Sequence, residues 1–255
     1  MFPFRVENPR FGLAIATAAI IALNLLVWIA IERVGAGATL PNTLCTLGLI
    51  PSALLGHLPP GTTIPLGEGI ACTMGSVPAW LTPLTSMFMH GGWFHLIGNM
   101  WFLWLFGRNV EDVMGPARYT AFYVLAGLAA AAAQVVADPG SALPMVGASG
   151  AISGVMGAYV VLFPKVRVHV LIFLGIFVTT VTLPAYMMLG YWFLLQVLGG
   201  SVNALQAAGG GVAFAAHVGG FLAGALLVNA FKSRTLLNRR EELLASARWD
   251  LMPGS

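Results

Sequence analysis

The strongest constraint on the fold of this chain is a series of long apolar segments separated by short polar ones. A transmembrane helix needs about 20 consecutive apolar residues. Runs that approach this length lie at roughly 11–31, 91–107, 117–137, 145–163, 182–199 and 212–231. Only 8% of the 255 residues are charged, whereas about 25% are charged in a typical soluble domain. The sequence therefore predicts an all-α, polytopic membrane protein with six transmembrane helices.

One apolar stretch does not fit a simple span. Residues 168–198 are too many for one membrane helix and too few for two. Polar residues and a proline interrupt this stretch at Thr179, Thr180, Thr182 and Pro184. We therefore predict that its first half lies at the membrane surface and that its second half crosses the membrane.

The basic residues orient the predicted spans. If the N-terminus is cytoplasmic, all of the 12 Lys and Arg residues except Arg33 fall on cytoplasmic tails or loops, as the positive-inside rule requires. A seventh span would place the basic C-terminal tail outside. Residues 1–10 and 232–255 are thus expected to be cytoplasmic tails around a membrane domain at 11–231. The sequence shows no organelle-targeting feature, which favours a bacterial plasma membrane.

The segment at about 34–89 predicts a long external loop that associates with the membrane. It contains no Lys or Arg, and it carries several apolar residues. Both cysteines of the chain, Cys45 and Cys72, lie in this loop. A disulfide on an oxidising side of the membrane and two free thiols are both compatible with the sequence.

Charge gives little evidence for soluble partners. The net charge of +3 is explained by the loops, so nucleic-acid binding has no support. The basic C-terminal tail is compatible with an amphipathic helix at the lipid surface and equally with a solvated segment. The sequence does not specify an oligomeric state.

A few polar side chains lie within the apolar runs, where they are costly and are therefore candidates for function. His95, Ser149 and His217 lie between 13 and 16 residues before the first cytoplasmic basic residue that follows each run. At 1.5 Å per residue, all three are about 20–24 Å above the cytoplasmic border and a few Å below the outer surface. Asn99 lies one turn deeper, on the same helix face as His95. Three helices that are distant in sequence thus bring polar groups to nearly one depth.

This combination of residues predicts acyl-transfer chemistry. Ser149 would be the nucleophile, and neutral His217 would be the base that removes its proton. His95, Asn99 and the backbone N–H of Ser149 would stabilise the oxyanion that forms. No Asp or Glu lies within the predicted spans to orient His217, so the expected site is a dyad. This chemistry requires no metal ion and no cofactor.

Small residues adjoin the predicted nucleophile and base. Gly150 and Gly154 form one G-x-x-x-G pattern, and Gly220 and Gly224 form another. Small residues at this spacing allow two helices to approach closely in lipid. We expect these glycines to bring the two helices near enough for the serine to bond to the histidine.

The other polar residues of the runs have a structural interpretation. Ser153, which shares a helix face with the predicted nucleophile, is expected to pack against a neighbouring helix. Asn24, Gln134 and Gln196 are expected to form hydrogen bonds between helices. Trp192 belongs to a set of tryptophans that fits the membrane interface and lipid-facing packing.

Three motifs taken together resemble those of the rhomboid intramembrane serine proteases. They are HGGWFHLIGNM, GASG and AHVGGFLAG, and the resemblance extends over about 80–231. It implies a six-helix bundle with Ser149 and His217 as the catalytic pair and with His95, Asn99 and the serine N–H as the oxyanion hole. It also implies that His90 lines the cavity. The partners would be membrane lipid and substrate proteins whose transmembrane segments are cut near their outer ends.

The sequence departs from this resemblance at one position. Some members of the family carry an aromatic residue four positions after the nucleophile, where the ring packs on the catalytic histidine. This chain has Ser153 at that position. Its histidine must therefore be oriented by another group or be held more loosely.

Two alternatives belong to other functional classes. One is a catalytically silent relative that binds transmembrane helices, although such relatives typically lack the serine or the histidine that this chain retains. The other is a small-molecule transporter, for which broken helices and an inverted repeat would be expected. The sequence shows neither of these two features clearly.

Overall fold

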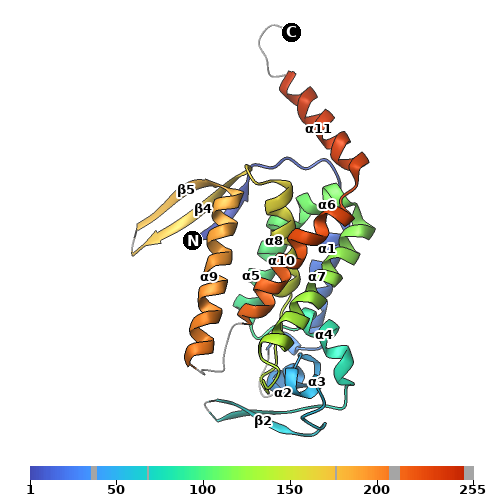
Figure 1. Ribbon diagram of the computed structural model, residues 1–255, viewed down its shortest axis with the longest axis vertical. Coiled ribbons are helices and arrows are strands. Elements are labelled where there is room, and N and C mark those ends of the chain that lie inside the picture. The colour runs from blue at the N-terminus through green and yellow to red at the C-terminus, as the bar shows by residue number, and fades with distance from the viewer. Residues whose placement is uncertain (36–38, 68, 176, 207–212, 250–255) are drawn as a thin grey trace.

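The computed structural model describes residues 1–35, 39–67, 69–175, 177–206 and 213–249. The chain forms a mostly helical bundle, with α10 packed between α7, α8 and α9 (Figure 1). Each of the six apolar runs overlaps one α-helix, and these helices are α1 (Ile15–Ala30), α5 (Trp93–Phe102), α7 (Pro116–Ala137), α8 (Ser149–Leu162), α9 (Ala185–Gln206) and α10 (Phe214–Phe231). Residue 212, the first of the last predicted span, and residues 250–255 of the predicted tail lie outside the described residues.

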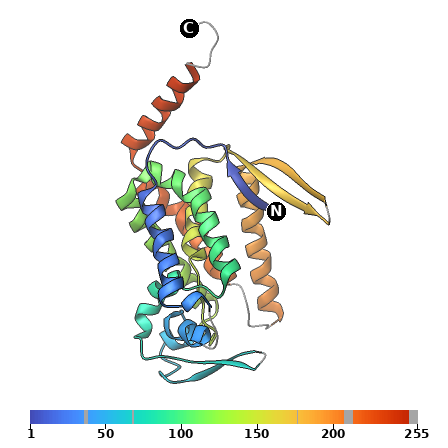
Figure 2. The ribbon, with the colours of Figure 1, turned by 180° about the vertical axis from the view of Figure 1, so that it is seen from behind.

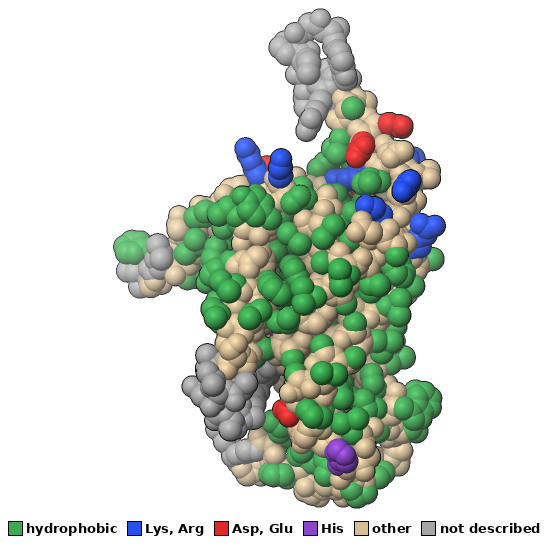
Figure 3. Space-filling view, in the orientation of Figure 1, with side chains coloured by type: hydrophobic (Ala, Val, Ile, Leu, Met, Phe, Trp, Pro, Cys, Tyr) green, Lys and Arg blue, Asp and Glu red, His purple; other side chains and the backbone are tan. Residues whose placement is uncertain are grey.

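Two of these helices, α7 and α10, are long and apolar enough to cross a membrane. The helices α1 and α8 are apolar but shorter, with 16 and 14 residues. Figure 3 shows hydrophobic side chains over the middle of one face, and Lys and Arg gathered at the end that carries α11 (Arg234–Trp249). The number of helices that cross the membrane stays a prediction.

The expectation of an all-α chain is wrong for the region before α9. The strands β4 (Arg167–Leu174) and β5 (Phe177–Pro184) form an antiparallel hairpin, and β1 (Phe2–Val6) pairs with β4. This region was predicted to lie along the membrane surface, and residues 1–10 were predicted only as a tail. Its β-branched Val, Ile and Thr residues favour strands, and Gly175 at the turn has a φ of 63°, which glycine adopts without steric cost.

The long loop before α5 is folded and lies at the opposite end of the bundle from α11 (Figure 1). It contains the short helices α2 (Thr39–Leu47), α3 (Pro51–Leu54) and α4 (Thr82–Thr85), and the hairpin formed by β2 (Thr63–Gly67) and β3 (Ile70–Thr73). A disulfide joins Cys45 to Cys72, with 6.1 Å between their Cα atoms. Leu49 and Met145 exchange backbone hydrogen bonds of 2.9 and 2.7 Å, so the loop is attached to the segment that leads into α8.

At the end of the bundle near α11, a buried acidic side chain joins α6 (Arg108–Met114) to α1. A π-helical turn connects α5 to α6, which carries the buried Glu111. Its carboxylate accepts hydrogen bonds of 2.8 Å from the N–H groups of Ala16 and Thr17, and one of 2.7 Å from the Thr17 hydroxyl. These are N–H groups of the first turn of α1, which have no acceptors within their own helix. Figure 2 shows the molecule from behind, with α1 and α5 on the side nearest the viewer.

Helices α8 and α10 approach each other through glycine backbone. A Cβ atom added at Gly220 would lie 2.1 Å from the carbonyl oxygen of Gly150, and one at Gly224 would lie 1.9 Å from that of Gly154. No real side chain tolerates contacts this short, so the two backbones touch directly. The four glycines of the two G-x-x-x-G patterns therefore lie at the contact between these helices.

Candidate active site

Ser149 is the first residue of α8, and the chain in front of it is tightly constrained. Gly147 has a φ of 121°, in the region that favours glycine, and its N–H donates to the carbonyl oxygen of Ser86 at 2.9 Å. Because Ser149 begins the helix, its backbone N–H has no intrahelical acceptor and is available to a ligand. Ser153 lies one turn further, where its buried hydroxyl donates to the Ser149 carbonyl oxygen at 2.6 Å.

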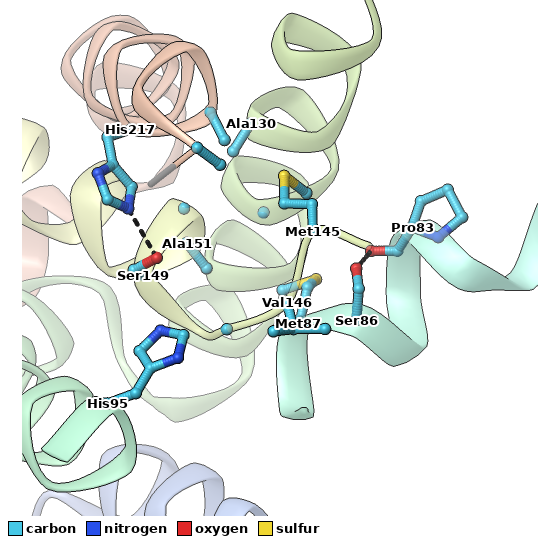
Figure 4. Close-up of a pocket in the computed structure, with 15 residues that line it drawn as sticks. Pro83, Ser86, Met87, His95, Ala130, Met145, Val146, Ser149, Ala151 and His217 are labelled. Carbon is cyan, nitrogen blue, oxygen red and sulfur yellow. Dashed lines mark hydrogen bonds between the residues drawn. The ribbon is translucent and has the colours of Figure 1, made fainter. Parts of the chain in front are cut away.

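His217 lies in the first turn of α10 and faces Ser149 across the glycine contact. Its Nε2 atom is 2.7 Å from the Ser149 Oγ atom, and Figure 4 shows the imidazole directed at the hydroxyl. This distance is within the range required for a serine and its general base. The structure thus brings together two residues that are 68 positions apart in the sequence.

The other side of the imidazole contacts α9. The Nδ1 atom of His217 is 2.8 Å from the Oε1 atom of Gln196. The Trp192 ring lies one turn earlier on α9, with its centroid 5.9 Å from that of the imidazole and an angle of 39° between the planes. The sequence identified Gln196 only as an interhelical hydrogen-bonding residue and Trp192 only as part of a membrane belt. Their i, i+4 spacing on one helix face was the signal available.

His95 and Asn99 approach the serine from α5. The Nδ1 atom of His95 accepts a hydrogen bond from the Gly91 N–H at 3.3 Å. The proton of a neutral His95 is therefore assigned to Nε2, which becomes a donor. A Cβ atom at Gly147 would lie 2.7 Å from this Nε2 and 3.6 Å from the Asn99 Nδ2 atom. Both side chains thus direct N–H groups at the segment that precedes Ser149.

His90 lies next to His95 but is not among the described residues that line the cavity. It is buried, and its ring is edge-on to that of His95, with centroids 5.2 Å apart. Its backbone N–H donates to the Oε1 atom of Glu32 at 2.6 Å. Glu32, just beyond the end of α1, was not identified from the sequence. Burial raises the pKa of this carboxyl to about 7, although the hydrogen bond from His90 opposes the shift.

A cavity of about 310 Å³ adjoins the serine and the two histidines. Most of its lining residues are small or flexible and apolar (Figure 4). They include Met87, Ala130, Met145, Gly150, Ala151 and Ala216. Among the residues that the structure describes, no three His, Cys, Asp or Glu side chains are placed to hold a metal ion.

The fold and the site together define the class of this protein. It is a helical membrane bundle with a serine–histidine pair between two closely packed helices. The Rhomboid domain matches residues 78–234, which is more than half of the chain, and the chain therefore belongs to the rhomboid family. This family is integral to membranes.

Similar proteins occur in bacteria and in eukaryotes. The chain is 31% identical to the rhomboid protease GluP of Bacillus subtilis (strain 168) over 61% of its own length and 25% of that protein. It is 38% identical to the chloroplastic rhomboid-like protein 11 of Arabidopsis thaliana over 30% of its own length and 27% of that protein. It is 34% identical to the human mitochondrial presenilin-associated rhomboid-like protein over 38% of its length and 26% of that protein. The matches thus span about a quarter of these relatives.

Proposed function

We propose that this protein is an intramembrane serine endopeptidase with Ser149 as nucleophile and His217 as general base. The observation that carries the proposal is the 2.7 Å contact between the Ser149 Oγ and His217 Nε2 atoms. Membership of the rhomboid family and similarity to a protein named as a rhomboid protease support the same reaction.

In the proposed reaction, the Ser149 Oγ atom attacks the carbonyl carbon of a peptide bond while its proton passes to the Nε2 atom of His217. The tetrahedral intermediate carries a negative oxygen, to which the His95 Nε2, the Asn99 Nδ2 and the Ser149 backbone nitrogen donate hydrogen bonds. The protonated imidazole then gives its proton to the departing amine. A water molecule, deprotonated by the same histidine, hydrolyses the acyl-enzyme and restores the serine.

We further propose six transmembrane helices with both termini in the cytoplasm, in a bacterial plasma membrane. The gathering of Lys and Arg at the α11 end supports this orientation (Figure 3). It places the site near the opposite surface, on the side of the disulfide-linked loop. Water can reach such a site over a short path, and hydrolysis needs that water.

The proposed substrates are transmembrane segments of other membrane proteins, cut near their outer ends. The cavity next to Ser149 is lined largely by alanine, glycine and methionine, which suits a small substrate side chain. The peptide must be extended to reach the serine, so small or helix-breaking residues near the cut favour cleavage.

The proposal is tested by cleavage of a transmembrane substrate in detergent, together with labelling by a serine-reactive fluorophosphonate. Ser149→Ala and His217→Ala should each abolish both signals without changing the unfolding temperature. Ser201→Ala is the matched control, because this exposed hydroxyl on α9 donates to the Val197 carbonyl oxygen of its own helix. Full activity in Ser149→Ala would refute the assignment. Absence of labelling in folded wild-type protein would favour a helix-binding protein without catalysis.

A further inference from the structure

Helix α9 presents one face to α10 and another to the surroundings. The partly buried positions are Trp192, Phe193, Gln196, Gly199 and Gly200, while the intervening large apolar residues are exposed. The contacts follow a single antiparallel register. Phe193 packs on Phe221 with ring centroids 4.7 Å apart, Gln196 meets His217, and a Cβ at Gly199 would lie 2.4 Å from the Phe214 ring. Gln196 and His217 thus form a polar contact between two apolar contacts of this interface.

The hydrogen bonds of Gln196 assign the position of each proton in the site. Its Nε2 atom lies 3.4 Å from the Trp192 carbonyl oxygen, which can only accept. The Oε1 atom therefore faces His217, and it too can only accept. The Nδ1 atom of His217, at 2.8 Å, must then carry the ring proton. This leaves Nε2 unprotonated and able to accept the proton of the Ser149 hydroxyl at 2.7 Å.

Two side chains of α9 contact His217. They take the role of the aromatic residue that some family members carry at the position of Ser153. Ser153, four residues after the nucleophile, bonds to the Ser149 carbonyl oxygen and does not reach the imidazole. The Trp192 ring lies beside the imidazole, and the Gln196 amide fixes its orientation. Among serine hydrolases, an acceptor on the Nδ1 side is what holds the reactive tautomer, and losing it lowers kcat steeply.

We propose that Gln196 is a positioning residue that holds His217 in the tautomer and orientation needed to deprotonate Ser149. The inference rests on the proposed protease function. Ser149 and His217 belong to α8 and α10, whereas Gln196 belongs to α9. The bond therefore exists only while α9 is packed against α10, and the competence of the dyad depends on that packing.

Three variants of Gln196 test this role. Gln196→Leu keeps a similar volume but removes the acceptor, so part of the histidine population takes the unreactive tautomer and kcat should fall about 100-fold, the lower end of what a general base contributes, with KM changed less than about 2-fold. Gln196→Glu keeps an oxygen acceptor of the same reach and should retain activity within about 5-fold. Gln196→Ala should resemble Gln196→Leu. Leu195→Ala is the matched control, because this neighbouring side chain of α9 is 43% exposed.

A second measurement does not depend on activity. The ¹⁵N NMR spectrum of histidine-labelled protein should show His217 as the Nδ1–H tautomer in the wild type and as a mixture in Gln196→Leu. The signal is assigned by its loss in His217→Ala. A merely structural role for Gln196 would change the unfolding temperature and leave the tautomer as it is.

The outcomes separate this inference from the proposed function. Wild-type kcat and an unchanged tautomer in folded Gln196→Leu would overturn the positioning role while leaving the dyad intact. If the wild-type protein cleaved the substrate no faster than Ser149→Ala, the proposed protease function would be wrong. The tautomer of His217 seen by NMR would then decide whether Gln196 positions this histidine. Loss of the Nδ1–H tautomer in Gln196→Leu with rescue in Gln196→Glu would establish it.

Discussion

Two of the interfaces of helix α10, those with α8 and with α9, are built in opposite ways. Against α8, it makes backbone-to-backbone contact through glycines, and a single added methyl group would overlap a carbonyl oxygen. Against α9, it makes contact through side chains, including the tilted Phe193–Phe221 ring pair and the Gln196–His217 hydrogen bond. The interface with α8 consists of backbone atoms and has no side chain that could move aside. The interface with α9 consists of side chains that can change rotamer.

This difference separates two requirements of the proposed chemistry. The distance between Ser149 and His217 depends on two helix backbones, so the glycine interface determines it. The orientation of the imidazole depends on what surrounds its ring, and α9 supplies Gln196 and Trp192 for that purpose. Two changes test whether the two interfaces differ in this way, and a third change lies away from both; they follow in decreasing order of their effect on activity.

The largest effect is expected from Gly224→Ala. The new Cβ atom would lie 1.9 Å from the Gly154 carbonyl oxygen, so α8 and α10 must move apart. A displacement of about 1 Å at the serine and its base can lower the rate about 100-fold. Overpacking of this kind also costs about 1–3 kcal/mol of stability. Cleavage rates and thermal unfolding in detergent measure both effects.

The control for this variant is Gly190→Ala on α9. A Cβ atom at Gly190 would meet nothing within 4 Å, so the substitution adds no clash. Alanine is favoured over glycine in a helix by about 1 kcal/mol, and this control should be as stable as the wild type or slightly more so. Equal losses in the two variants would show that glycine itself, and not its place at the interface, is what matters.

An intermediate effect is expected from Phe193→Ala, which weakens the contact of α9 with α10. Removing a half-buried aromatic ring should cost about 2 kcal/mol, less than for a fully buried one. Because the Gln196–His217 bond requires packed α9, kcat should fall several-fold, but less than in Gly224→Ala. Leu194→Ala is the control, since this neighbouring side chain is 51% exposed. If the two variants had the same kcat, the activity would not depend on the packing of α9.

The smallest effect on activity is expected on the far side of the site, in Glu32→Gln. Burial raises the pKa of Glu32 to about 7 in the folded protein, against an ordinary value of 4.5 for a solvated glutamate. The folded state therefore retains a proton that the unfolded state loses, and stability should fall as pH rises from about 4.5 to 7. The total change is about 3 kcal/mol at 1.36 kcal/mol per pKa unit.

In Glu32→Gln the amide oxygen still accepts the hydrogen bond from His90, so activity at pH 6 should remain near the wild-type value. The fall in stability between pH 4.5 and 7 should disappear from the variant, as measured by thermal unfolding in detergent at several pH values. An unchanged pH dependence would mean that a group other than Glu32 is responsible for it.

Much of the site follows from the sequence because its motifs are local. The residues Ser149, His217, His95 and Asn99 were identified from spacing, depth and family resemblance, and the structure places all four around one short segment. The approximate positions of six helices followed from the apolar runs, because helices in lipid need long apolar segments. Among the described helices, α7 and α10 are long and apolar enough to cross a membrane, and the other spans stay a prediction. The family itself is shown by the match to the Rhomboid domain.

What the sequence did not predict depends on contacts between distant segments. The partner of the His217 Nδ1 atom is Gln196, and an isolated glutamine in an apolar helix gives no indication of which neighbour it meets. The sheet of β1, β4 and β5 depends on pairing between segments that are more than 160 residues apart. Apolar β-branched residues suit a strand as well as a segment at the membrane surface, so composition alone did not distinguish the two.

The disulfide in the long loop has a consequence for the unfolded chain. Cys45 and Cys72 are 27 positions apart, and closing a ring of that size lowers the conformational entropy of the denatured state by an amount worth about 3.5 kcal/mol. The ring contains Leu49, whose backbone bonds to Met145 just before the serine. Because of this covalent bond, the loop has fewer conformations in the unfolded chain. Less entropy is therefore lost when the loop packs against the segment that leads into Ser149.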